Sequence, residues 1–238
     1  MDTPQGRLFL IPNTLGDSNP LEVLPLTVRK AVENIDHYIA ENEKVARRSI
    51  QRIAPGKSQP DLQFELLNKF TDPSEIRSFL DPCLIGQDVG ILSDAGAPGI
   101  ADPGAAVVAL AHEIGIRVIP LVGPSSILLA MMASGMNGQK FAFHGYLPID
   151  KRERRQVIKQ LERDSKANDQ AQLFIETPYR NDQLFEALLS VLNGTTRVCV
   201  AADITLPTEF IRTLTVEEWK KNKVDLHKRP TLFIIQNN

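Results

Sequence analysis

Two loops rich in glycine and proline hold the residues of this sequence best suited to bind a ligand. The first, residues 93–104, reads SDAGAPGIADPG and lies between an apolar run and a run typical of a helix. Glycine lets the backbone turn through positive φ or approach a ligand closely, and proline stiffens the loop. The second loop reads GPSS, residues 123–126, and also follows an apolar run. Both patterns predict a ligand held between a strand and a helix, although any α/β domain needs such residues in its turns.

The first loop leads into a helix predicted over residues 105–114. The free N–H groups and the dipole at such a helix start favour a carboxylate or a phosphate. Two carboxylates of the loop, Asp94 and Asp102, have an alternative role as caps of a turn or of the helix.

Histidine and cysteine do not indicate metal chemistry. The four histidines, His37, His112, His144 and His227, do not cluster at the spacing of metal ligands. The two cysteines lie far apart, at positions 83 and 199, without CxxC spacing. We therefore expect no metal site, and we expect buried thiols of a cytoplasmic protein.

Composition describes a globular chain and leaves nucleic acid open as a partner. The 238 residues are 42% hydrophobic and carry a formal net charge of -2. Such a chain has no general attraction for a polyanion, so RNA would have to meet a local patch. The basic run at residues 151–155 is a candidate for phosphate contacts, although charge runs usually form solvated faces.

Neither end of the N-terminal half suggests a targeting segment. The first residues, MDTPQGRLFLIP, lack a basic region followed by a long apolar run. The most apolar window, residues 118–134, is broken by Pro120, Gly123 and Pro124 below the roughly 20 residues of a spanning helix. We expect no membrane segment.

Strand and helix patterns alternate along the first half of the chain. Strands are predicted at residues 7–11, 37–40, 89–92 and 118–122, with helices at 26–34, 41–52, 73–80 and 105–114. This alternation predicts a parallel sheet with helices on both faces. Residues 61–72 show too little periodicity to assign and suit a flap.

The second half begins with the same alternation and then changes. Helices are predicted at residues 125–134, 151–163 and 181–192, and strands at 140–144, 171–176 and 197–202. Two further strands, 210–214 and 231–235, flank a short helix at 216–221, which indicates a mixed sheet. We therefore predict two α/β domains, residues 1–122 and 123–238, with a ligand cleft between them.

Four motifs resemble one known family in order and spacing. They are SDAGAPGIADPG, GPSS, FAFHGYLP at residues 141–148 and FIETPYR at residues 174–180. Together they closely resemble the tetrapyrrole methylase superfamily. Within it they are most similar to the branch that methylates a ribose 2′-hydroxyl of small-subunit ribosomal RNA. The resemblance covers most of the chain, from Gly6 to about Gln236.

The resemblance implies an S-adenosylmethionine-dependent methyltransferase that forms a homodimer. It implies that the cofactor lies folded against the glycine-proline loops. By position, the implied cofactor-binding residues are Pro12, Asp94, Gly96, Ala97, Gly99, Ile100, Ser125, Ser126, Leu147, Thr177 and Pro230.

Methyl transfer to a ribose hydroxyl needs good positioning and gains from a base. The displacement is in line, so a near-attack geometry lowers most of the barrier. The hydroxyl has a high pKa, which makes a positioned carboxylate useful. The candidates are Glu41, Asp17 and Glu176. Without the resemblance, Glu41 belongs to a solvated helix start, and Glu176 has an alternative role in orienting its own loop.

Three segments differ from the ribosomal RNA branch. The first loop reads PNTLGDS, Asn42 stands where the branch has an acid, and residues 202–206 read ADITL where the branch has two basic residues. Conserved cofactor loops with changed acceptor contacts fit the same chemistry on a different acceptor. RNA remains the favoured acceptor. The alternatives are a tetrapyrrole, a protein, or a module that binds the cofactor without methyl transfer.

Overall fold

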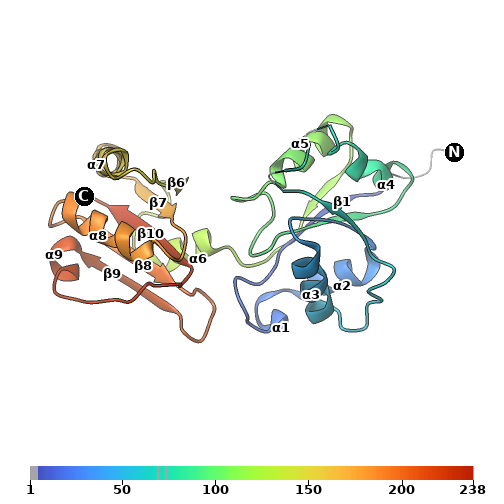
Figure 1. The fold of residues 1–238 in the computed structure, drawn as a ribbon, viewed down its shortest axis with the longest axis horizontal. Helices are drawn as coiled ribbons and strands as arrows, with labels where there is room; N and C mark the ends of the chain where they lie inside the picture. Colours follow the sequence, from blue (N-terminus) through green and yellow to red (C-terminus); the bar gives the residue numbers. More distant parts are fainter. Residues whose placement is uncertain (1–4, 69, 73, 238) are drawn as a thin grey trace. The chain divides into compact units, whose positions relative to one another are not determined.

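The protein folds as two compact units in this computed structural model. The structure describes residues 5–68, 70–72 and 74–237. The first unit is Met1–Ser125 and the second is Ser126–Asn238 (Figure 1). The two-domain α/β architecture expected from the sequence is confirmed, and each unit is described by itself below.

The first unit is built on a five-stranded parallel sheet with the order β3-β2-β4-β1-β5. Its strands are β1 (Leu8–Ile11), β2 (His37–Ala40), β3 (Gln63–Leu66), β4 (Val89–Leu92) and β5 (Val118–Pro120). In register, β1 pairs with β4 from Leu8 opposite Val89 to Ile11 opposite Leu92. Every residue of β4 is buried, as expected for the central strand of a sheet that is covered on both faces.

Helices cover both faces of this sheet. They are α1 (Pro20–Val23), α2 (Leu26–Asn34), α3 (Glu43–Ile53), the 3₁₀ turn η1 (Ser78–Leu80), α4 (Asp81–Leu84) and α5 (Ala105–Glu113). One core packs α2 and α3 around Ile11, Tyr38 and Leu92, and the other packs η1, α4 and α5 around Leu8 and Ile91. In Figure 1, α2 and α3 lie on one side of β1, and α4 and α5 lie on the other.

The second unit is built on a mixed sheet with the order β6-β7-β10-β8-β9. Its strands are β6 (Phe141–Tyr146), β7 (Ala171–Ile175), β8 (Arg197–Ala202), β9 (Phe210–Thr215) and β10 (Thr231–Gln236). Only β6 and β7 pair in parallel, whereas β10 runs antiparallel to both of its neighbours and β9 antiparallel to β8. The mixed sheet predicted for the second half is therefore confirmed.

Aromatic side chains form the centre of the second unit. Its helices are α6 (Ser126–Ser134), α7 (Lys151–Asn168), α8 (Asn181–Val191) and α9 (Val216–Trp219). Phe174, Phe233 and Trp219 are almost fully buried, and the rings of Phe185 and Trp219 meet edge to face at 5.2 Å between centroids. The Trp219 indole N–H donates to the Val198 carbonyl, which satisfies its one polar group inside the core.

Two sequence expectations in the first unit are wrong. Residues 61–72 were expected to form a flap, yet Gln63–Leu66 form the edge strand β3, paired with β2. The helix expected over residues 73–80 is absent from the described part of that range, which holds turns and η1. Pro82 instead opens the short helix α4, because proline suits the first turn of a helix.

The two cysteines are free and buried, as expected. No helix within residues 5–68, 70–72 and 74–237 is long and apolar enough to cross a membrane.

Candidate functional site

Three loops meet at the carboxyl ends of β1, β4 and β5 in the first unit. The chain leaves β1 toward β2 on one side and leaves β4 toward β5 on the other, because β1 and β4 are neighbours at the centre of the sheet. Such a switch in direction opens a crevice at the carboxyl ends of the strands, where α/β sheets bind ligands. The loop after β1 begins at Pro12, the central loop after β4 is residues 93–104, and the GPSS loop follows β5.

Asn13 joins the first two loops. Its backbone forms an isolated antiparallel bridge with Gly96, in which Asn13 N donates to Gly96 O at 2.9 Å and Gly96 N donates to Asn13 O at 3.2 Å. Its side-chain amide donates to the carbonyls of Ser93 and Asp94, and to Ser49 Oγ at 2.8 Å. Asn13 is only 5% exposed, so these bonds are protected from water and fix the start of the central loop.

Glycines let the third loop approach the other two. A Cβ at Gly96, where φ is +70°, would lie 3.2 Å from Leu15 Cδ2 and 3.5 Å from the Pro124 carbonyl oxygen. A Cβ at Gly123 would lie 2.3 Å from the ring of Pro12, a distance that no folded protein tolerates. The sequence-predicted residues Pro12, Gly96 and the GPSS loop are therefore brought together.

Asp102 holds the second half of the central loop. Its Oδ1 accepts from Gly99 N at 2.6 Å and from Gly104 N at 2.9 Å. The expectation that free N–H groups at the start of α5 receive a carboxylate or a phosphate is therefore wrong for these two groups. An aspartate of the chain already occupies that place, so the capping role considered for Asp102 is the one observed.

Three carboxylates make the site acidic. Burial raises the pKa of Glu41, and the nearby charges of Asp94 and Asp102 raise it further. Burial also raises the pKa of Asp94, with a contribution from Asp102. Carboxylates that raise one another's pKa gain when a cation comes between them.

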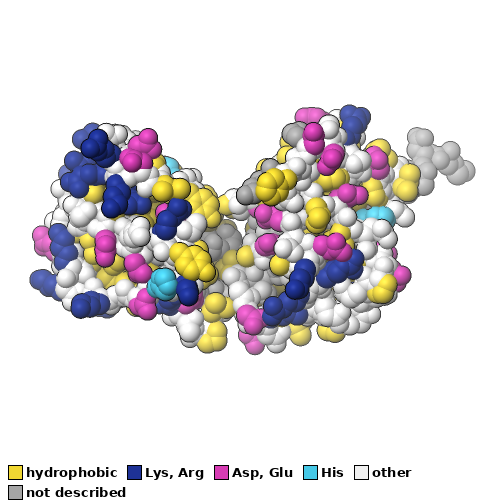
Figure 2. Space-filling model, in the orientation of Figure 1, with side chains coloured by type: hydrophobic (Ala, Val, Ile, Leu, Met, Phe, Trp, Pro, Cys, Tyr) yellow, Lys and Arg dark blue, Asp and Glu magenta, His cyan; other side chains and the backbone are white. Residues whose placement is uncertain are grey.

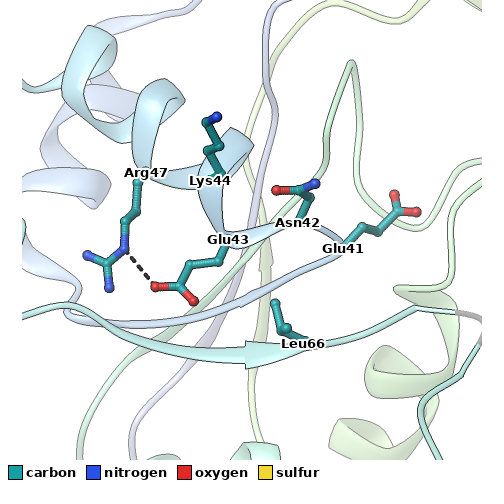
Figure 3. A pocket seen from close by; sticks show the side chains of 6 residues that line it. All are labelled: Glu41, Asn42, Glu43, Lys44, Arg47 and Leu66. Atoms are coloured by element: carbon teal, nitrogen blue, oxygen red, sulfur yellow. Dashed lines mark hydrogen bonds and ion pairs between the residues drawn. The ribbon is translucent and has the colours of Figure 1, made fainter.

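Glu41 stands between β2 and α3. Asn42 is the N-cap of α3, and its side chain accepts from Val45 N at 3.2 Å. This capping role gives a structural reason for an asparagine where the related branch has an acid. Glu41 lines a pocket of about 510 Å³ together with Asn42, Glu43, Lys44, Arg47 and Leu66. In Figure 3 its carboxylate points away from the ion pair between Glu43 and Arg47.

Asp17 lies on a different side of α3. It lines a second pocket, of about 290 Å³, that also includes Asn13 and Asp94. Its side chain is 78% exposed and pairs with Arg52 at 3.2 Å and Arg48 at 3.6 Å. Asp17 is thus held by two cations and open to water.

Glu176 is placed at the end of β7 in the second unit and is 4% exposed. Its Oε1 accepts from Thr177 N, and from Arg180 Nη2 at 2.6 Å. Its Oε2 is buried and has no hydrogen-bond partner among the residues described. The loop-orienting role considered for Glu176 is therefore observed for one of its oxygens, and the other is left over.

The remaining predicted residues differ in exposure. In the central loop, Ala97 and Gly99 are half-buried and Ile100 is exposed. Ser125 and Ser126 are half-buried at the junction of the two units, and in the second unit Leu147 is buried, Thr177 half-buried and Pro230 exposed. No contact with a ligand tests these assignments, which stay predictions.

Metal-ligand clusters were searched for throughout the described ranges. No group of three or more His, Cys, Asp or Glu side chains there is placed to hold a metal ion.

Sequence reasoning missed Asn13 and Asp102 as the residues that shape the site. Asn13 follows the proline that ends the β1 run, and an asparagine at that point was a signal for a side chain that bonds backbone. What the sequence did not contain is its partner, since Gly96 is 83 residues further along the chain.

A doubly wound parallel sheet with three loops converging at its switch point defines a ligand-binding α/β protein. The chain belongs to the tetrapyrrole (corrin/porphyrin) methylase family, whose model matches residues 20–220. The enzyme class is therefore that of the methyltransferases.

Curated relatives agree on one name. The chain is 28% identical over 240 residues to "Ribosomal RNA small subunit methyltransferase I" of Escherichia coli O157:H7, covering 100% of this chain and 80% of that protein. It is 29% identical over 210 residues to the protein of the same name from Bacillus subtilis (strain 168), covering 87% of this chain and 67% of that protein.

Solved structures share the fold. Uroporphyrin-III C-methyltransferase from Thermus thermophilus, complexed with S-adenosylhomocysteine, matches with a TM-score of 0.57 at 17% identity and covers 98% of both chains. A diphthine synthase matches with a TM-score of 0.66 at 15% identity, covering 97% of this chain and 90% of that one. At these identities the likeness concerns the fold alone.

Proposed function

We propose that this protein transfers the methyl group of S-adenosylmethionine to a ribose 2′-hydroxyl of small-subunit ribosomal RNA. The acidic cluster of Glu41, Asp94 and Asp102 beside the three loops carries the proposal. S-adenosylmethionine brings an ammonium and a sulfonium, and a cation offsets the repulsion between these carboxylates. Membership of a methylase family and relatives named as ribosomal RNA methyltransferases support the same reading.

The cofactor site proposed here draws on both units. In the first unit it comprises Pro12, Asp94, Gly96, Ala97, Gly99, Ile100 and Ser125, and in the second Ser126, Leu147, Thr177 and Pro230. The unpartnered buried Oε2 of Glu176, next to Thr177, supports a polar ligand group at that end of the second sheet, since buried oxygens are rarely left without a donor. The Gly99 N–H is bonded to Asp102, so Gly99 contributes through its exposed Cα rather than as a donor.

Glu41 is the base in this proposal. When bound, S-adenosylmethionine supplies an electrophilic methyl group. Glu41 takes the proton of the ribose hydroxyl, for which a raised pKa is an advantage. Glu176 and Asp17 are poorer candidates because each is already paired with arginine, Glu176 with Arg180 and Asp17 with Arg48 and Arg52.

A labelling experiment tests this function. The purified protein is incubated with methyl-labelled S-adenosylmethionine and small ribosomal subunits, free ribosomal RNA, or an extract of cells that lack the protein. We expect label in small-subunit RNA, at the 2′-oxygen of one nucleotide. Label that appears only in protein or in a small-molecule fraction contradicts RNA as the acceptor, and no label in any fraction contradicts methyl transfer.

A further inference from the structure

Helix α7 in the second unit presents a row of cations to solvent. Five of its exposed residues are basic and recur at intervals of 3, 4, 4 and 3 positions: Arg152, Arg155, Lys159, Arg163 and Lys166. Residues three and four apart are neighbours on a helix surface. The five therefore form one continuous row, called here the α7 stripe, along about 21 Å of helix at 1.5 Å per residue.

The stripe contains no acidic residue. At 100° per residue its five members fall within an arc of about 80°. The exposed acid Glu153 and the half-buried Asp164 lie on another side of the helix. Glu162 is buried, where it accepts from Asn193 N and from the Thr196 hydroxyl. Figure 2 shows Lys and Arg side chains gathered over α7.

The stripe does not serve the stability of the helix. None of its five cations takes part in an ion pair printed for the described ranges, where eight such pairs occur elsewhere. Like charges at these spacings repel one another. Arg152 and Arg155 also lie in or near the first turn of α7, where the helix dipole disfavours cations.

Arg154 changes the patch that the sequence suggested. The basic run at residues 151–155 was the candidate for phosphate contacts, but Arg154 is 5% exposed and faces the core side of α7 with Ile158 and Leu161. The available cations continue along the helix to Lys166 instead of ending with the run.

We propose that the α7 stripe binds the phosphate backbone of the RNA acceptor over about three helical turns, outside the methyl-transfer site. This inference rests on the proposed function. The chain as a whole carries a net charge of -2, so attraction to RNA has to come from a local concentration of cations such as this one. Three of the five are arginines, whose planar guanidinium matches phosphate.

A lipid surface fits the stripe less well than RNA does. A helix that lies on a membrane inserts large apolar side chains beside its cations. No large hydrophobic side chain of α7 is exposed, because Ile158 and Leu161 are buried in the core of the second unit. Phosphates arranged along a hydrated chain are the anions that such a row can meet.

A pair of matched variants tests the stripe. The stripe variant combines Arg155→Ala, Lys159→Ala and Arg163→Ala. The control combines Lys220→Ala, Lys221→Ala and Lys223→Ala, three exposed lysines of the same unit, and so removes the same charge. The affinity of each full-length protein for a single-stranded RNA is measured at several salt concentrations, together with its affinity for S-adenosylmethionine.

We expect the stripe variant to bind RNA more weakly, with a salt slope reduced by about two units, since each phosphate contact in a single strand contributes about 0.7. The control is expected to keep the wild-type slope, and both variants to keep the wild-type affinity for S-adenosylmethionine. In methyl transfer to RNA, KM should rise in the stripe variant while kcat stays within a few-fold.

The outcomes separate this inference from the proposed function. If the wild type methylates RNA and the stripe variant keeps its salt slope, or the control loses as much, the stripe is a solvated face and the function stands. If the wild type binds RNA through the stripe but labels another acceptor, the inference stands and the proposed function is wrong. A wild type without salt-dependent RNA binding overturns the inference outright.

Discussion

At the scale of single residues, Asn13 holds the candidate site together. Its amide bonds two carbonyls of the central loop and Ser49. We predict that Asn13→Ala lowers the free energy of unfolding by about 1–3 kcal/mol, because it leaves buried acceptors without a donor. Affinity for S-adenosylmethionine should fall at least tenfold, since the loop that presents Asp94 and Gly96 loses its fixed start.

Urea unfolding and calorimetry measure these two effects. Asn34→Ala is the matched control, because Asn34 is exposed and its amide bonds only the Lys30 carbonyl within α2. It should change stability by less than about 0.5 kcal/mol and leave cofactor binding intact. Equal cofactor affinity in Asn13→Ala and the wild type would remove Asn13 from the site.

Glu41 should set the acid limb of the activity profile. A base acts only when deprotonated, so activity is lost as the pH falls through its pKa. Burial, together with Asp94 and Asp102, raises the pKa of Glu41 above the ordinary glutamate value. We predict that Glu41→Gln lowers kcat by about 10²–10⁴ and abolishes this limb. Glu43→Gln, beside it and paired with Arg47, should keep both kcat and the limb.

The same carboxylate should cost stability at neutral pH. Because its pKa is raised in the folded state, the native protein binds more protons than the unfolded chain, and stability falls as the pH rises between the two pKa values. Glu41→Gln should therefore raise the free energy of unfolding at neutral pH. Below the ordinary glutamate pKa of about 4.3 the difference from the wild type should vanish. Urea titrations at several pH values measure it, and a destabilised variant at neutral pH contradicts the assignment.

At the scale of elements, α7 carries a cost that a single change relieves. Lys159 has Arg155 and Arg163 four residues to either side. Lys159→Glu replaces two repulsive pairs with two attractive ones, each worth about 0.2–0.5 kcal/mol. We predict that its free energy of unfolding rises by about 1 kcal/mol, measured by urea denaturation at low salt.

High salt provides the check on this prediction. Screening weakens exposed charge pairs, so the gain of Lys159→Glu should shrink in molar salt. Gln156→Glu is a suitable control, because it also adds an acid to the exposed side of α7 but lies between the cations and the acids of the helix. A gain that does not respond to salt would show that repulsion along the stripe is not its cause.

The elements that sequence could predict are those with a buried face. The apolar runs of β1, β2, β4 and β8 and the periodic pattern of α2 fixed their ends to within a residue. Strand β3 could not be found this way, because three of its four residues are exposed and its pairing with β2 supplies its order. The extension of α7 to Asn168 was missed for a similar reason, since its last turns are mostly polar.

The site was predictable in its loops and not in its internal bonds. Glycine and proline at fixed positions indicated where backbone turns closely, and Gly96 and Gly123 do so. That Asp102 bonds Gly99 and Gly104, or that Asn13 bonds Gly96, depends on how the loop closes in space. Periodicity and motif spacing contain no such information.

At the scale of the whole molecule, the division of the chain is open to test. The sequence placed the boundary after Val122, and the compact units divide between Ser125 and Ser126. The three residues at issue are in contact with the first unit. Gly123 lies against the ring of Pro12, and the Pro124 carbonyl lies beside Gly96.

Two fragments of the first unit, residues 1–122 and 1–125, decide between these boundaries. We predict that both fold, because the parallel sheet and its two cores lie within residues 8–120. The longer fragment should be more stable by about 1 kcal/mol or more, since Pro124 is buried and covering Pro12 removes apolar surface from water. Thermal unfolding of the two fragments, with Gly123→Ala in the longer one, measures this. The alanine should cancel the gain, because its Cβ cannot fit against Pro12. Equal stability of 1–122 and 1–125 would place the boundary after Val122 and leave the GPSS loop to the second unit.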